Sequence, residues 1–258
     1  MTATKAFSAE ILKTKNTATK WLILAGAAFI PLLELAIFLN NPQKVKLNPG
    51  ENPWDFFLKG TFQFASVFII PLFVVLATSL IMHIENKSNT WKHILVLPVS
   101  KDLIFLSKLL LILCSVIAFY CCFIAFLFLD MGVLKAQLKQ FSVSNNVFHW
   151  QYLCSLTFQS FISVLAILAI HFWLSLRIKN VIVVVSIGLT GLFIALVLSS
   201  PGMWKNVVFF PYALPALISY RLNPLYHYQD VPNNIYGLIF FMIIILLCYG
   251  DYKRNFRG

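Results

Sequence analysis

The fold is decided by apolar runs such as Leu109–Leu129, LLLILCSVIAFYCCFIAFLFL, which contains no charged residue. A run of about 18 or more apolar residues can cross a membrane as a helix. Five further apolar runs lie at Trp21–Leu39, Phe62–Met82, Leu153–Leu176, Val181–Ser199 and, shorter than the others, Ile235–Tyr249. The sequence therefore predicts an all-α integral membrane protein, with six transmembrane helices in one domain over residues 1–258.

Composition supports this class. Hydrophobic residues make up 60% of the 258 residues, charged residues only 11%, and there are 25 Phe, which is unlike a soluble domain. The formal net charge of +11 does not indicate nucleic-acid binding, because Lys and Arg lie at the ends of the apolar runs. The five Cys lie in or beside apolar runs without a C-x-x-C pair, so neither a disulfide framework nor a metal site is predicted.

The distribution of Lys and Arg predicts the orientation in the membrane. If the N-terminus is cytoplasmic, the cytoplasmic segments carry 13 Lys and Arg and the outer segments carry 7. This excess places both termini in the cytoplasm. On the predicted outer side, Trp54, Trp150 and Trp204 flank apolar runs, as residues of an aromatic belt do.

The connections between the apolar runs differ in length. Residues 40–60 form an ordinary polar loop, and Arg177–Asn180 is so short that the fourth and fifth helices must form a hairpin. The fifth connection contains an apolar stretch, Val207–Ile218, that is too short and too broken to span the membrane. We expect it to form a re-entrant outer segment, which needs protein cover for its backbone.

The N-terminal segment predicts a short amphipathic helix at the membrane surface, followed by an uncleaved first span. Phe7 and Ile11 lie one helical turn apart, while Glu10 and Lys13 fall on the other side of such a helix. The first apolar run is too long for a secretory signal, and no convincing cleavage site follows it.

The polar insert from Glu85 to Lys108 separates the second and third apolar runs on the predicted cytoplasmic side. Residues 90–97 fit a short amphipathic helix that Pro98 would end. Ser100 is positioned to cap the helix that follows. On physical grounds this insert is either an interfacial loop anchored by Trp91 and lysines or a docking element.

The sequence holds no motif for catalysis by this chain. It lacks the G-x-x-x-x-G-K-[ST] phosphate loop, the G-x-S-x-G elbow and the H-E-x-x-H zinc helix. We therefore expect a transport or scaffold subunit, which is not an enzyme and binds no cofactor or metal.

The insert resembles the cytoplasmic loop between spans two and three of type-2 ABC-transporter permeases, especially the lantibiotic and bacitracin export or immunity group. The N-terminal Glu10-x-x-Lys13 also resembles that group's lead-in to the first span. Together with the six spans and the loop lengths, the resemblance covers nearly the whole chain. The matching insert positions are Glu85, Thr90, Trp91, Lys92, Ile94, Leu95, Pro98, Val99, Ser100, Lys101 and Lys108.

The resemblance implies a permease subunit of an ATP-binding cassette exporter in a bacterial cytoplasmic membrane. The short helix would be a coupling helix seated in a separate ATPase subunit, and that partner would bind ATP and Mg. A second permease chain, identical or different, would complete the transporter. The implied substrate is amphiphilic: a peptide antibiotic, a drug or a lipid-like molecule. An ion-coupled carrier and a membrane scaffold are the alternatives.

Two polar residues lie inside predicted spans. Glu34 is about 20 Å along the first span, where an unpaired carboxylate is costly. It either contacts the translocation path or another span, or lies close to the outer headgroups because of Pro31 and helix tilt. His171 favours an interhelical hydrogen bond over a proton relay. Gly188 and Gly191 permit close helix approach, within one chain or between two chains.

Overall fold

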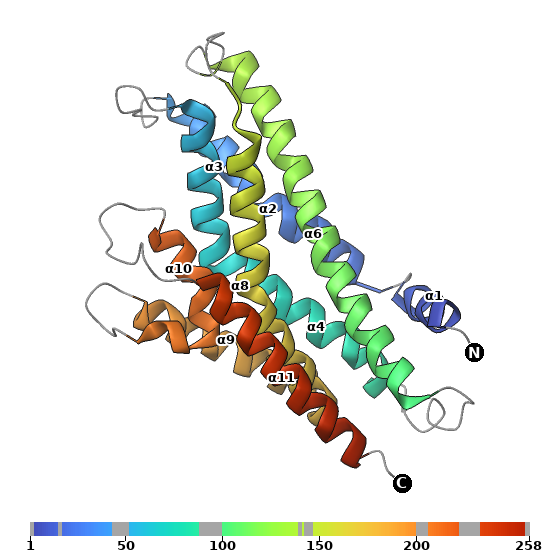
Figure 1. Ribbon diagram of the computed structural model, residues 1–258. Helices are drawn as coiled ribbons and strands as arrows, with labels where there is room; N and C mark the ends of the chain where they lie inside the picture. Colours follow the sequence, from blue (N-terminus) through green and yellow to red (C-terminus); the bar gives the residue numbers. More distant parts are fainter. Residues whose placement is uncertain are drawn as a thin grey trace.

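The computed structural model describes residues 3–14, 17–42, 52–87, 100–138, 141, 147–199, 206–221 and 233–255. These residues form a bundle of helices (Figure 1). The helices are α1 (Ala3–Thr14), α2 (Thr19–Asn40), α3 (Pro53–Phe64), the π-helix η2 (Ala65–Ile69), α4 (Ile70–Lys87), α6 (Lys101–Gln137), α8 (Trp150–Arg177), α9 (Val181–Leu198), the 3-10 helices η3 (Val207–Phe209) and η4 (Pro211–Ala213), α10 (Leu214–Arg221) and α11 (Asn233–Asn255).

Six helical stretches of the described chain are long and apolar enough to cross a membrane, which confirms the predicted number of spans. The N-terminal helix α1, the start of α6 and the end of the C-terminal helix α11 lie toward one end of the bundle, here called the termini end (Figure 1). The start of α3, the end of α6 and the start of α8 lie toward the opposite, distal end. This arrangement suits two termini on one side of a membrane; that this side is cytoplasmic remains a prediction.

The second span begins earlier than its sequence suggests. Pro53–Ile84 is one 32-residue helical stretch, so the prediction of a polar loop over residues 40–60 is wrong for its last eight residues. The Asn52 side chain accepts a hydrogen bond from the Trp54 amide, and Pro53 occupies the first helical position. Trp54 is buried rather than part of an interfacial belt, and it contacts Phe141 with ring centroids 5.0 Å apart.

Pro71 lies just after a π-helical turn, which is wider than an α-helical turn, in this span. Proline has no N–H group, and its ring collides with the carbonyl four residues earlier in a regular α-helix. Here the π-helix Ala65–Ile69 precedes it, and the Ile70 amide bonds to the Ala65 carbonyl five residues back. The wide turn therefore provides the local adjustment that a proline inside a span requires.

The third span is also longer than predicted. α6 contains 37 residues, or about 55 Å of helix, against a hydrocarbon core of about 30 Å. The predicted span Leu109–Leu129 is only its middle. Residues 101–108, the last part of the polar insert, form its first two turns.

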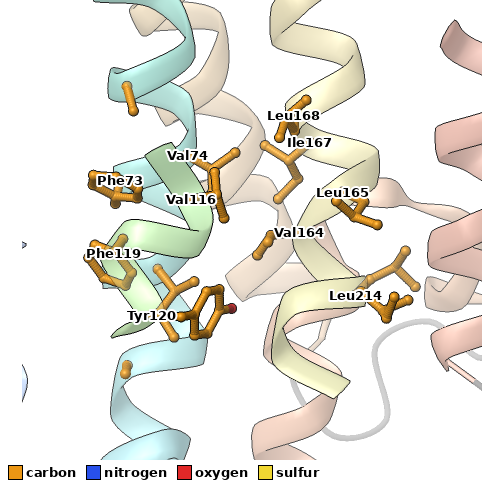
Figure 2. Close-up of a cluster of buried hydrophobic side chains, with 14 of the residues drawn as sticks. Phe73, Val74, Val116, Phe119, Tyr120, Val164, Leu165, Ile167, Leu168 and Leu214 are labelled. Atoms are coloured by element: carbon orange, nitrogen blue, oxygen red, sulfur yellow. The ribbon is translucent and has the colours of Figure 1, made fainter. Parts of the chain in front are cut away.

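The core lies where α4, α6 and α8 meet. Phe73 of α4 stacks on Phe119 of α6 with ring centroids 4.1 Å apart. Figure 2 shows Val164 and Ile167 of α8 facing the side on which Val116 of α6 lies, and all three residues are fully buried. α2 packs against α6, and α11 packs against α8.

The apolar stretch of the fifth connection has protein cover. It forms η3, η4 and α10, which contact α3, η2, α8, α9 and α11, and Val207, Ala213, Leu214 and Leu217 are fully buried. Such cover is what a re-entrant backbone needs. The depth of this stretch in a membrane remains a prediction.

His171 makes the interhelical hydrogen bond that its sequence position favoured. Its Nε2 atom lies 3.1 Å from the Tyr212 hydroxyl of η4. Gly188 of α9 lies against His171 and Val75, and Gly191 lies against Tyr212. Both glycines therefore make contacts within the chain, so their small size brings α9 close to α4, α8 and η4.

Gly188→Ala is expected to destabilise the fold. An added Cβ would lie 2.5 Å from Val75 Cγ1 and 2.7 Å from His171 Cε1, and overpacking of this kind costs about 1–3 kcal/mol. Gly132→Ala in α6 is the matched control, because an added Cβ meets nothing within 4 Å there. It should be neutral or stabilising by up to about 1 kcal/mol. Thermal unfolding of the two variants in detergent measures the difference, and equal midpoints would contradict this packing.

Candidate ATPase-coupling site

The structure describes the two ends of the insert and leaves its middle undescribed. α4 ends at Lys87, and the description resumes at Ser100. Glu85 belongs to α4, but its side chain is not described. The assignment of a coupling helix therefore stays a prediction. The following predicted coupling residues lie outside the described residues: Thr90, Trp91, Lys92, Ile94, Leu95 and Pro98.

Ser100 caps α6, as predicted. Its backbone is extended, and its side-chain oxygen accepts a hydrogen bond from the Leu103 amide at 3.4 Å. Lys101 is the first residue of α6 and Asp102 is the second. The insert thus leads directly into the longest helix of the protein.

An ion pair attaches α1 to α6 near the insert. Lys108 Nζ lies 3.1 Å from Glu10 Oε2, and Lys13 Nζ lies 2.7 Å from Glu10 Oε1. The Lys108 side chain is 3% exposed and that of Glu10 is 11% exposed. Lys108 thus provides a buried counter-charge for Glu10, and the side of α1 that carries Glu10 lies against α6.

Burial alone would raise the pKa of Glu10. The ion pairs with Lys108 and Lys13 outweigh this effect, so the pKa of Glu10 lies below its ordinary value of 4.5. Glu10 is therefore charged at neutral pH and bridges two lysines.

The Glu10–Lys108 pair fixes which side of α1 lies against the bundle. Phe7 is partly buried and packs against the core, whereas Ile11 and Leu12 are exposed. Phe7 and Ile11, the two predicted apolar positions, thus have different surroundings. The exposed pair forms an apolar edge suited to the membrane surface.

The end of α11 joins the start of α6 as well. The Tyr249 hydroxyl donates to Asp102 Oδ1 at 2.9 Å, and Lys253 Nζ lies 3.7 Å from the same oxygen. Phe105 packs on Tyr249 and Tyr252, with ring centroids 5.4 and 5.3 Å apart. The first two turns of α6 therefore contact both terminal helices.

A second ion pair joins α8 to α11. Asp251 accepts hydrogen bonds from the Arg177 guanidinium and, at 2.9 Å, from the Trp173 indole. Arg177 ends α8, just before the short connection to α9. We use the name basal cluster for Glu10, Lys13, Asp102, Lys108, Arg177, Tyr249, Asp251 and Lys253.

Glu34 lies inside the bundle. It is 4% exposed, and Thr61 of α3 donates a hydrogen bond to its carboxylate. A Cβ added to Gly60 would lie 3.2 Å from Glu34 Oε1, so the carboxylate sits against the α3 backbone. Asp130 of α6, also buried, is near enough to interact electrostatically with it. This supports the alternative in which Glu34 contacts another span.

Sequence reasoning missed the Glu10–Lys108 pair and Asp130. The pair joins residues 98 positions apart, and nothing local in either segment indicates the other. Asp130 lies one residue beyond the predicted third span, and the position of Lys135 and Lys139 suggested that a loop began there. A longer α6 would have placed Asp130 inside a span.

Together, these features define a multi-pass membrane protein with a charged cluster at the end that holds both termini. A family model described as ABC-2 family transporter protein matches residues 6–197. The chain belongs to this family, whose members are the membrane subunits of ABC transporters and work with ATPase subunits. Comparisons with curated proteins and with solved structures gave no significant match.

Lys108→Met is expected to loosen α1. The substitution removes a charge-assisted hydrogen bond, which contributes about 1.5–3 kcal/mol, and leaves Glu10 with one of its two lysines. Hydrogen exchange in residues 3–14 should accelerate. Lys20→Met, at an exposed position of α2, is the control and should leave exchange unchanged.

The same contact should depend on pH. Because the pKa of Glu10 is lowered in the fold, its contribution is fully present above the ordinary value of 4.5 and is lost as the pH falls through the lowered value. Exchange protection of α1, corrected for the intrinsic rate, should persist to about that pH in the wild type. Glu10→Gln should abolish the transition, and a transition of the same size in that variant would contradict the assignment.

Proposed function

We propose that this chain is the permease subunit of an ATP-driven exporter and moves an amphiphilic substrate across a bacterial cytoplasmic membrane. The observation that carries the proposal is the basal cluster. It fastens the start of α6, which directly follows the insert, to both α1 and α11. The chain itself would bind no ATP or Mg; both would belong to the ATPase partner.

Force would enter through the insert. Thr90, Trp91, Lys92, Ile94, Leu95 and Pro98 would seat in a cleft of the ATPase, with Glu85 and Lys101 at the two bases of the insert. Any displacement would pass into α6 at Ser100. Because Lys108 and Asp102 hold α1 and α11 to this helix, the three would move together. α1, with Phe7, Glu10, Ile11 and Lys13, would contact the same ATPase and the lipid surface.

The transporter would contain two permease chains, identical or different, and two ATPases. The substrate would pass between the permeases: a peptide antibiotic, a drug or a lipid-like molecule. The resemblance to lantibiotic and bacitracin permeases favours a peptide antibiotic. Both termini and the basal cluster would face the cytoplasm.

An ion-coupled carrier is the second candidate. One observation favours it: two carboxylates, Glu34 and Asp130, are buried within the spans, and intramembrane carboxylates often mark ion pathways. A carrier would work without an ATPase. Export that persists after the partner's phosphate loop is inactivated would favour the carrier.

Polar replacement of Trp91, Ile94 and Leu95 tests the coupling assignment. The triple Ser variant should lose co-purification of the ATPase and ATP-coupled export, because the apolar face of the insert would be gone. The matched control is Ser replacement of Leu246 and Leu247, two exposed apolar residues of α11. An unchanged complex and unchanged export in the triple variant would overturn the proposal.

Substitutions of Glu34 test its place in the translocation path. Glu34→Gln retains an acceptor for Thr61, whereas Glu34→Leu leaves the buried Thr61 hydroxyl with only its backbone partner, the Phe57 carbonyl. If Glu34 contacts substrate through its charge, both variants should reduce export. If it only joins α2 to α3, Glu34→Leu should lower the melting temperature and Glu34→Gln should export normally.

A further inference from the structure

Glu34, Thr61 and Phe57 form a short row of oxygen atoms where α2 meets α3. The Thr61 hydroxyl contacts Glu34 Oε2 on one side and the Phe57 carbonyl oxygen, at 2.9 Å, on the other. Glu34 is 4% exposed, and Thr61 and Phe57 are fully buried. The row therefore lies inside the first and second spans, away from solvent.

Two hydrogen bonds along this row require two hydrogen atoms. A threonine hydroxyl has one hydrogen to donate, although its oxygen can also accept. A carbonyl oxygen has no hydrogen. Between these three oxygen atoms, the second hydrogen can come only from Glu34, which has one to donate when its carboxyl group is protonated.

A charged Glu34 gives a less favourable arrangement. Its carboxylate accepts the one hydrogen of Thr61, so Thr61 Oγ1 and the Phe57 carbonyl oxygen lie 2.9 Å apart with no hydrogen between them. Two oxygen atoms in this position repel each other, because both carry partial negative charge. Protonation removes the repulsion, because Glu34 then donates to Thr61 and Thr61 donates to Phe57.

The described surroundings of Glu34 supply no positive charge. α2 packs against α3, η2, α4 and α6, and no ion pair of the described residues includes Glu34. Asp130 of α6 is the titratable group of these elements that acts on Glu34 electrostatically, and one negative charge disfavours another nearby. A carboxylate buried without a cation is costly, and protonation removes that cost.

We propose that Glu34 binds a proton in the folded protein and donates a hydrogen bond through it to Thr61 Oγ1. The proton is taken up from water and stays on Glu34 Oε2, while Thr61 donates its own hydrogen to Phe57. The contact between the first two spans is then a proton-binding site without net charge on Glu34. This inference does not depend on the proposed transport function, because it concerns the contact between two spans and not the movement of a substrate.

Asp130 is the other buried carboxyl group on which a proton could reside. It is 1% exposed, and its Oδ2 atom is buried without a hydrogen-bond partner in the described part of the chain. A proton on Asp130 Oδ2 thus has no acceptor there, whereas a proton on Glu34 has Thr61. The geometry favours Glu34, and a spectroscopic experiment separates the two residues.

Infrared difference spectroscopy tests the proposal, because a protonated carboxyl group and a carboxylate absorb at different frequencies. The sample is the full-length permease, purified with any ATPase that accompanies it, in phosphatidylcholine vesicles at neutral pH. Subtracting the spectrum of Glu34→Gln from that of the wild type should leave the C=O absorption of a protonated carboxyl group. Glutamine keeps the shape and can donate to Thr61, so the fold should be retained.

Asp102→Asn is the matched control for a charged carboxylate. Asp102 is 57% exposed beside Lys253, so its difference spectrum should show carboxylate absorption. Carboxylate absorption in the Glu34 difference spectrum would overturn the proposal. A protonated-carboxyl absorption that Asp130→Asn removes and Glu34→Gln leaves in place would overturn it as well.

Replacements of Thr61 test the direction of the hydrogen bond. Thr61→Val has nearly the same shape but no acceptor, so the Glu34 absorption should move to higher frequency, as it does when a carboxyl group loses a hydrogen bond. Thr61→Ser keeps the hydroxyl and should leave the frequency unchanged. Glu34→Gln in each background supplies the baseline, and an unshifted absorption in Thr61→Val would overturn donation to Thr61.

Discussion

In hydrocarbon, a backbone N–H or C=O group finds no water to bond, so the chain must satisfy each of these groups itself. Most of this structure follows from that constraint. Long helices satisfy the groups one residue at a time, and caps such as Asn52, Ser100 and Asn180 satisfy some of those left at helix starts. Where the sequence cannot continue a helix, as in residues 207–213, neighbouring helices surround the backbone instead.

The ion pairs of the described residues lie at the two ends of the bundle. At the termini end, opposite charges pair with one another and hold α1, α6, α8 and α11 together. At the distal end, the Asp55–His149 pair leaves a carboxylate oxygen unpaired. The first arrangement fixes helices in place, and the second joins the start of α3 to the residue before α8.

The sequence predicts the number of helices because a membrane span is a property of one segment. It places four of the six spans within about five residues of their observed ends, along with the cap at Ser100 and the short connection that ends at Asn180. It misplaces the ends of the second and third spans, because Pro53–Gly60 and Lys101–Lys108 read as polar although tertiary contacts bury residues such as Phe57 and Lys108. Pairings such as Glu10 with Lys108 depend on two distant segments, and one sequence without its fold does not show them. The insert residues 90–98 gain their assignment from resemblance alone.

The π-helical turn at Ala65–Ile69 determines in which direction the side chains of the rest of the second span point. Successive residues of an α-helix are rotated by about 100°, and one extra residue in a turn shifts everything that follows by that angle. Before the turn, α3 contacts α10, α2 and α8; after it, α4 contacts α8, α9, α2 and α6. The turn thus lets a single continuous helix present two differently directed faces to two sets of neighbours. Loss of one residue here would rotate half the span by about 100° and turn part of its core side toward lipid, although no individual contact residue would have changed.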